Sequence, residues 1–181
     1  GGPRVAKEDQ SKALCSAYKD LEGGSKYRGK LPDPGSSRKR KSEENIATEP
    51  GTIVAVVAGR ISGKNQLDAD SLAVLTTRVK QETMEIEWDV PEGQWRLMAF
   101  WLKFTGQECQ AQNARPPAMV IDHLNQGAVR RYCDYLGGTL EKAVGGEFGK
   151  TVDSFFCDSF EIQPLHNSLL WSTDTLSGFK K

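Results

Sequence analysis

The chain has no long apolar run, no excess of charge and no closely paired cysteines. None of its apolar stretches reaches the length of about 18 residues that a membrane-spanning helix needs, so we expect no membrane span. The 24 basic and 24 acidic residues cancel, which gives no global preference for nucleic acid. The opening GGPRVAKEDQSK has neither the apolar core nor the cleavage pattern of a signal peptide, and no initiator Met precedes it. We therefore expect a segment of a longer polypeptide that binds no nucleic acid.

The cysteines are too widely spaced for a typical zinc site. There is no CxxC pair and no His at a zinc-like interval from a cysteine, which argues against zinc. Spacing alone does not exclude disulfides. We interpret Cys133, on a helical face, and Cys157, in an apolar run, as small buried hydrophobic residues.

The first part of the chain combines short elements with a polar loop. Residues 1–22 predict a short helix and then an extended piece that ends at Gly23-Gly24. The stretch LPDPGSSRKRKSEENIATEP is rich in Pro, Ser, Gly and charge, which indicates a loop or linker. Its basic run RKRK could be a localisation signal or a phosphate patch, but glutamates follow at once and no aromatic residue is interleaved. A solvated loop is therefore the simpler interpretation.

Residues 52–110 have the pattern of a β-rich unit. TIVAVVAGR is a β-rich apolar run, and Met84, Ile86 and Trp88 alternate with glutamates. The turn residues of DVPEGQW, followed by RLMAFWLKF, predict a hairpin. The aromatic residues of this unit fit a core or a sugar-stacking platform, and their place in strand patterns favours the core. They are Trp88, Trp95, Phe100, Trp101 and Phe104.

Residues 111–181 predict helix, strand and helix in that order. Apolar residues recur every fourth position from Leu124 to Val144, which indicates an amphipathic helix that Gly137-Gly138 bends or splits. VDSFFCD predicts a buried strand and SLLWSTDTLSGFKK the start of a second helix. GGEFGKT is not a phosphate-binding loop, because Val144 stands where its first Gly is needed and a strand follows it. The order of elements is typical of a parallel α/β architecture.

Two carboxylates, Asp158 and Glu161, end the apolar stretch FFCDSFE. Active sites of parallel α/β folds are built at the carboxyl ends of strands, where such a pair can supply a general acid or base, a metal ligand or an orienting acceptor. The alternative is a helix-capping Asp and a surface Glu.

Three further residues are candidates for substrate binding. His123 follows Asp122, which we expect to cap a helix, and is either a ligand or a plain loop histidine. His166 lies just past the two carboxylates. Trp171, with Ser172 after it as a possible N-cap, offers a flat apolar face to a sugar ring or packs the next helix.

Seven segments, taken in order, resemble the bacterial α-L-rhamnosidases of glycoside hydrolase family 106. They are GGPRVAKEDQSKAL, LEGG with LPDP, TIVAVVA, WDVPEGQWRLMAF, IDHLNQGAVRRYCDYL, GKTVDSFFCDSFE and WSTDTLSGF. The resemblance implies an α/β fold, in which partial (β/α)8 barrel segments are interrupted by a small β-rich insertion. Residues 1–51 would be an early barrel segment with the charged linker, residues 52–110 the insertion, and residues 111–181 a middle barrel segment.

The resemblance also implies an activity. Such enzymes release terminal α-linked rhamnose from plant glycans or glycosides with inversion, in the periplasm or outside the cell, and calcium is associated with the sugar site. Glu161 matches the glutamate of the family's DS[WF]E strand end, so we expect it to be the general acid, with Asp158 orienting it. The family usually has an aromatic residue after GGP, where this chain has Arg4.

No second catalytic carboxylate is identifiable in the chain, so we expect the segment alone to be inactive and to need the remaining domains of the parent polypeptide. The alternative function is a non-catalytic carbohydrate-binding or interaction module. In that case Trp95, Trp101 and Trp171 would form a sugar platform and the carboxylates would be structural.

Overall fold

The computed structural model describes residues 4–35, 51–109, 118–155, 162, 165 and 167–179. The chain divides into two compact units, each described here by itself. Unit 1 consists of Gly1–Lys12, Phe104–Pro164 and Leu170–Lys181, and unit 2 of Ala13–Lys103 and Leu165–Leu169.

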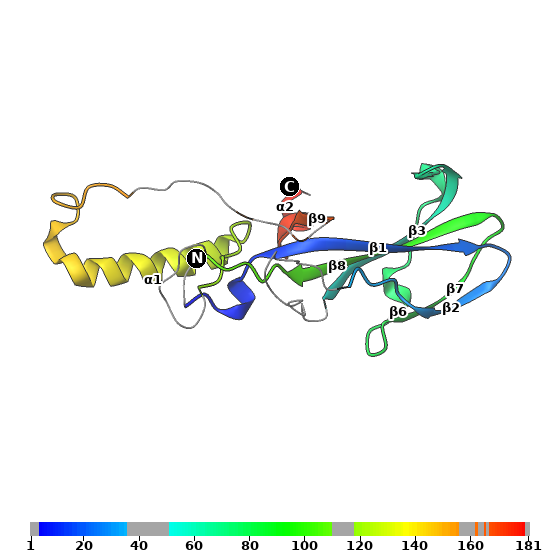
Figure 1. Ribbon diagram of the computed structural model, residues 1–181, viewed down its shortest axis with the longest axis horizontal. Coiled ribbons are helices and arrows are strands. Elements are labelled where there is room, and N and C mark those ends of the chain that lie inside the picture. The colour runs from blue at the N-terminus through cyan, green and yellow to red at the C-terminus, as the bar shows by residue number, and fades with distance from the viewer. Residues whose placement is uncertain are drawn as a thin grey trace, which may run out of the picture. The chain divides into compact units, whose positions relative to one another are not determined.

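Unit 2 is built on two β-sheets (Figure 1). The strands of the larger sheet are β1 (Lys12–Glu22), β3 (Thr52–Gly63), β4 (Gln66–Leu67), β5 (Ala73–Val74), β8 (Gln94–Phe104) and β9 (Ser168–Leu170). Their order is β4-β3-β8-β1-β9, with β5 paired to β3. The smaller sheet contains β2 (Lys26–Lys30), β6 (Val79–Lys80) and β7 (Glu85–Asp89), in the order β2-β7-β6. Short 3-10 helices, η2 (Ala69–Ser71) and η3 (Thr76–Arg78), connect some of these strands.

One hydrophobic core joins residues of both sheets. Along β8 every second side chain is buried, because side chains of a strand alternate between its two faces. Trp95 and Trp101 enter the core from β8, and Ile86 and Trp88 enter it from β7. The rings of Trp88 and Trp95 meet edge to face, with centroids 5.4 Å apart. The prediction that these tryptophans belong to the core is confirmed.

The sequence correctly predicts the strand at Thr52–Gly63 but pairs the next strands wrongly. β7 and β8 do not form a hairpin: β7 pairs antiparallel with β2 and β6, whereas β8 pairs antiparallel with β3. The chain passes from one sheet to the other through the turn that contains Gly93, whose φ is 105°. Alternation shows which face of a strand is buried, and both strands bury one face in the same core, but alternation does not identify the partner strand.

A second turn packs directly against this crossing. The N–H of Gly23 donates to the carbonyl of Gly93 at 2.7 Å, and that of Gly24 donates to the carbonyl of Val90 at 3.0 Å. A Cβ atom on Gly23 would lie 1.9 Å from the carbonyl oxygen of Pro91, so only glycine fits there.

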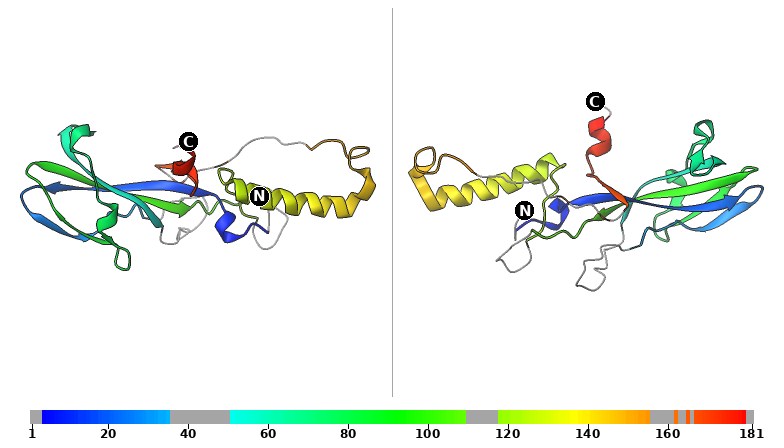
Figure 2. Two further views of the ribbon diagram at one scale, coloured as in Figure 1. Left: turned by 180° about the vertical axis from the view of Figure 1, so that it is seen from behind. Right: turned by 45° about the horizontal axis from the view of Figure 1, so that its top comes forward.

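Unit 1 contains the long helix α1 (Gln126–Val144), the 3-10 helices η1 (Lys7–Asp9) and η4 (Gly145–Glu147), and the short helix α2 (Thr175–Phe179). α1 continues through Gly137 and Gly138, so the predicted split does not occur. Ala128 is the residue of α1 that is buried, and the later turns of the helix are largely exposed. Both views of Figure 2 show α1 as one continuous helix. In the described part of the chain, no helix combines the length and the apolarity that a bilayer crossing needs.

The expectation of partial (β/α)8 barrel segments is wrong. The pairings of β2 and β6 with β7, and of β4, β5 and β8 with β3, are antiparallel, and from β3 to β8 only short 3-10 helices lie between the strands. The physical reason is visible in β8, which buries one face, whereas a strand of a parallel barrel is apolar on both faces. The boundaries at residues 52 and 110, which concern the parent polypeptide, remain predictions.

Two local predictions near the end of the chain also need correction. In VDSFFCD, Val152 makes an isolated bridge to Phe148, and residues 153–155 are irregular and exposed, while the rest lies outside the described residues. SLLWSTDTLSGFKK begins as the strand β9, and the helix α2 starts only at Thr175. Cys133 is exposed on α1, contrary to prediction, and Cys157 lies outside the described residues.

Candidate functional site

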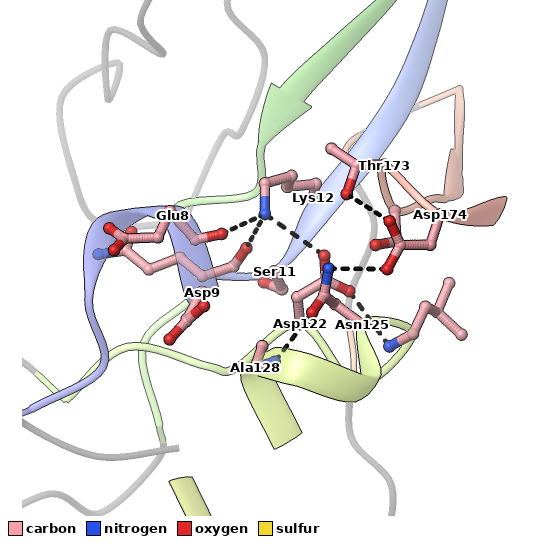
Figure 3. A network of polar contacts seen from close by, with 12 residues as sticks. Glu8, Asp9, Ser11, Lys12, Asp122, Asn125, Ala128, Thr173 and Asp174 are labelled. Atoms are coloured by element: carbon pink, nitrogen blue, oxygen red, sulfur yellow. Dashed lines mark hydrogen bonds and ion pairs between the residues drawn. The ribbon is translucent and has the colours of Figure 1, made fainter. Parts of the chain in front are cut away.

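A network of polar side chains surrounds the beginning of α1 in unit 1 (Figure 3). Three separate stretches of sequence contribute to it. η1 and the residue that opens β1 supply Asp9 and Lys12, the stretch before α1 supplies Asp122 and Asn125, and the turn before α2 supplies Asp174.

Lys12 and Asp122 form the buried part of this network. The Lys12 Nζ atom donates to the carbonyls of Glu8 at 2.6 Å and Gln10 at 3.2 Å, and to the Asp122 carboxylate at 3.4 Å. An ammonium group has three N–H donors, so all of them are used. The two side chains are 9% and 3% exposed, respectively. Such a pair contributes little net stability but fixes geometry, because either charge alone would be costly to bury.

The start of α1 is capped by Asn125 rather than by Asp122. The Asn125 side chain accepts a hydrogen bond from the N–H of Ala128 at 2.8 Å and donates to Asp174 at 3.2 Å. Asp122 instead accepts from the N–H of Leu124 at 3.1 Å. The predicted helix start is therefore correct, but the capping residue lies three positions later.

A second ion pair connects η1 to α1. Arg131 donates through Nε to one Asp9 oxygen at 2.9 Å and through Nη2 to the other, which is a bidentate arrangement. The Asp9 side chain is buried. The hydrogen bonds and charge of Arg131 lower the pKa of Asp9 against the opposing effect of burial, so Asp9 is a carboxylate near neutral pH.

A cavity of about 160 Å³ opens beside this ion pair. Asp9 and Arg131 line it together with Arg4, Tyr132 and Tyr135. The two tyrosine rings are tilted with centroids 6.3 Å apart, and the Arg4 guanidinium lies 5.7 Å from the centroid of the Tyr135 ring. Aromatic surface combined with a few fixed polar groups is the usual make-up of a small-molecule site.

The described residues include only some of the site residues predicted from the sequence. Asp158, Glu161 and His166 lie outside the described residues. The N–H of Trp171 donates to the Lys12 carbonyl at 3.3 Å. His123 follows Asp122 directly, and partial loss of water contact lowers the pKa of its imidazole, while the Asp122 charge acts in the opposite direction.

Trp171 thus contacts Lys12 through a backbone hydrogen bond, and His123 is the sequence neighbour of Asp122. Trp95 and Trp101, by contrast, are only 7% and 4% exposed. The indole N–H of Trp101 donates to the carbonyl of Pro32 at 2.9 Å. These two tryptophans cannot stack on a sugar, which removes most of the platform on which the binding-module alternative depends.

Sequence reasoning missed the charged residues of the network. Asp9, Lys12 and Arg131 are ordinary charges in their local patterns, and each finds its partner more than a hundred positions away along the chain. The only local signal was the polar IDHLN stretch before the helix, which correctly marks the helix start.

The described residues do not fit the calcium ion that the family resemblance implies. Calcium prefers several carboxylate and carbonyl oxygens around one point. Among the described residues, no group of three or more His, Cys, Asp and Glu side chains converges in this way. The two buried carboxylates, Asp9 and Asp122, are already neutralised by Arg131 and Lys12. Calcium therefore stays a prediction of the resemblance.

Comparison with known proteins gives one positive result. No curated protein and no solved structure matches the chain. A family model described as alpha-L-rhamnosidase, that of glycoside hydrolase family 106, matches residues 49–181. The match covers most of the chain, including the long helix, the buried Asp122 that precedes it and the stretch FFCDSFE. The chain therefore belongs to the α-L-rhamnosidase family of glycoside hydrolases.

Proposed function

We propose that this chain is part of a glycoside hydrolase that releases terminal α-L-rhamnose from plant glycans or glycosides. The observation that carries the proposal is the family match over residues 49–181, which includes both Asp158 and Glu161. We place the protein in the periplasm or outside the cell, where such glycans are degraded. Calcium belongs to the proposal only as a group that residues outside the described part would hold.

The proposed reaction inverts the anomeric centre. One protonated carboxyl group donates to the leaving oxygen while a second carboxylate, about 6.5 to 9.5 Å away, activates water. Glu161 is the proposed acid, with Asp158 as its orienting neighbour; a nearby carboxylate raises the proton affinity of the acid. The second carboxylate is assigned to another part of the parent polypeptide, so the 181-residue chain alone is expected to be inactive.

The polar network supports a role for His123 and Trp171 in binding the substrate. Both belong to unit 1 and adjoin a pair of buried, fully bonded charges, so their backbone positions are fixed before substrate arrives. A fixed first contact lowers the entropy cost of binding and orientation. The burial of Trp95 and Trp101 favours the enzyme over the binding-module alternative.

The decisive experiment replaces Glu161 by Gln in the full-length protein. Turnover is measured on an aryl α-L-rhamnoside and on a natural rhamnose-containing disaccharide. Loss of a general acid costs typically about 10²- to 10⁴-fold in rate, and the disaccharide should suffer more, because its leaving oxygen needs the proton. The aryl leaving group departs with little protonation and serves as the less sensitive substrate.

Glu141→Gln is the matched control, because it makes the same change at an exposed position of α1. It should leave both rates unchanged. Wild-type turnover of the disaccharide by Glu161→Gln would show that the acid is a different residue. Separately, an Asp158→Asn variant should shift the pH profile of turnover if Asp158 tunes the acid.

A further inference from the structure

We propose that one face of α1 pairs with the same face of a second copy of this chain, so that two copies associate through an antiparallel pair of helices. The face is a row of apolar and small residues, called here the α1 stripe, that runs along most of the helix. All of its members belong to unit 1. They are Val129, Cys133, Leu136, Gly137, Leu140 and Val144.

The α1 stripe is accessible in the structure. Leu136 is 42% exposed, and Cys133 is also exposed. Val129, Leu140 and Val144 are half-buried. The spacings of three and four residues place these side chains on one side of a helix with 3.6 residues per turn. The cavity beside the first turns of α1 is lined by other residues of the helix, so the stripe faces a different direction.

The order of residues along the stripe identifies a second copy as the partner. In a contact with two-fold symmetry, residue i of one copy meets residue j of the other, and j meets i. We centre the antiparallel pair between Leu136 and Gly137, so that each of these residues lies opposite the other in the second copy. The remaining pairs are then Val129 with Val144 and Cys133 with Leu140. Every member of the stripe meets another member, so the stripe is complementary to itself.

Charged residues beside the stripe favour the antiparallel direction. Arg130 and Glu141 are exposed and flank the same edge of the stripe. Neither takes part in an ion pair with another described residue. In the antiparallel pair, Arg130 of each copy approaches Glu141 of the other, and this contact occurs twice. A parallel pair would instead bring like charges together.

Gly137 fits this contact better than it fits an isolated helix. Glycine is among the least favourable residues inside a helix. A Cβ atom at this position would meet nothing within 4 Å in the described part of the chain, so no described neighbour requires glycine there. In the proposed pair, the space beside Gly137 receives the Leu136 side chain of the other copy.

The contact is small, so the association is weak. α1 has 19 residues, which corresponds to a length of roughly 28 Å. Two helices of this length form an interface at the low end of the usual size range, where complexes are transient. We expect a dissociation constant in the micromolar range. At the lower concentrations of a turnover or labelling assay, the two copies are therefore separate.

The test measures the molar mass of the full-length protein by sedimentation equilibrium over a range of concentrations. We expect a monomer–dimer equilibrium, which Leu136→Glu should weaken about tenfold or more, because the variant buries two carboxylates at the centre of the contact. Leu72→Glu is the matched control, because Leu72 is 51% exposed but belongs to unit 2. Arg130→Glu should also weaken the dimer, and the double variant Arg130→Glu/Glu141→Arg should restore it.

Cysteine cross-linking tests the register of the two helices. Leu140→Cys places a thiol opposite Cys133 of the other copy, so mild oxidation should link the two copies by a disulfide. Lys142→Cys introduces a thiol at an exposed position of α1 outside the stripe and should link few copies. Electrophoresis without reductant measures the yield, and mass spectrometry of the linked peptides identifies the two cysteines.

Three results would overturn the proposal. A protein that stays monomeric at every concentration would leave the remaining domains of the parent polypeptide as the occupant of the stripe. A dimer that Leu136→Glu does not weaken would associate through another surface. A disulfide between the Cys133 residues of two wild-type copies, formed as readily as the link in Leu140→Cys, would indicate a parallel pair.

Discussion

The Lys12 Nζ atom and the Asp122 carboxylate lie 3.4 Å apart, although 110 positions separate them in the sequence. Both side chains are buried. The backbone carbonyl of Lys12 accepts from the N–H of Trp171, and His123 directly follows Asp122. The two members of this ion pair therefore adjoin two candidate substrate-binding residues of unit 1.

Replacing Lys12 by Met should destabilise the protein strongly. The change leaves the Asp122 carboxylate buried without its counter-charge, and such losses cost about 3–5 kcal/mol. The double variant Lys12→Met/Asp122→Leu removes both charges and should lose less stability than the single one. The free energy of unfolding, from urea titration followed by circular dichroism, measures both.

The contrary result is a double variant that is clearly less stable than Lys12→Met. In that case the two mutations lower the free energy of unfolding independently, and the pair does not have the assigned role. Lys142→Met, at an exposed position of α1, controls for the loss of a lysine and should change the stability little.

The Asp9–Arg131 pair should make the fold sensitive to acid. Hydrogen bonds and charge from Arg131 lower the pKa of Asp9 below 3.8 in the folded state. The unfolded chain therefore takes up the proton at higher pH, so the contribution of the pair is fully present above about pH 5 and is lost as the pH falls through the folded pKa. The free energy of unfolding between pH 2 and pH 7 should decline at the acidic end.

Asp9→Asn should reduce this decline, because the titrating group is gone, and should lower the stability at pH 7. Asp134→Asn changes an exposed carboxylate of α1, the helix that carries Arg131, and should leave the pH dependence nearly as in the wild type. If Asp9→Asn shows the same decline in the free energy of unfolding at low pH as the wild type, other carboxylates cause that decline.

The elements of this fold could be predicted where local periodicity determines them. The period of apolar residues from Leu124 to Val144 identified α1, and the β-rich run at residue 52 identified β3. In β3 the apolar run includes the buried residues Val56 and Ala58, whereas of the periodic apolar residues of α1 only Ala128 is buried. The strand alternation also placed the core tryptophans correctly, since a half-buried strand buries every second side chain.

The way in which these elements pair could not be predicted from local sequence patterns. Trp88 and Trp95 follow one another closely in the sequence but lie in different sheets, because the chain crosses between them at Gly93. The family resemblance led us to expect a parallel barrel, which the antiparallel pairing of β3 with β8 contradicts. The Asp9–Arg131 contact joins residues 122 positions apart, so no spacing rule could have revealed it.

Asn125→Ala should weaken the start of α1. The Asn125 side chain accepts a hydrogen bond from the N–H of Ala128, and removal of such a cap costs about 1 kcal/mol. Asn125→Asp keeps the accepting oxygen and should retain the helix. Amide hydrogen exchange at Ala128 and Val129 would show the loss directly, since Ala128 loses its acceptor. Equal exchange rates in the alanine and aspartate variants would exclude the capping role.

The cysteines should differ sharply in reactivity. Cys15 is 4% exposed, and burial raises the pKa of its thiol. Cys133 is exposed on α1. Because the thiolate is the reactive species, iodoacetamide at pH 8 should modify Cys133 rapidly and Cys15 only after the fold opens. Mass spectrometry of the labelled peptides measures both rates, with labelling in urea as the reference for full access. Fast labelling of Cys15 under native conditions, at a rate near that of Cys133, would show that β1 is not held in the larger sheet.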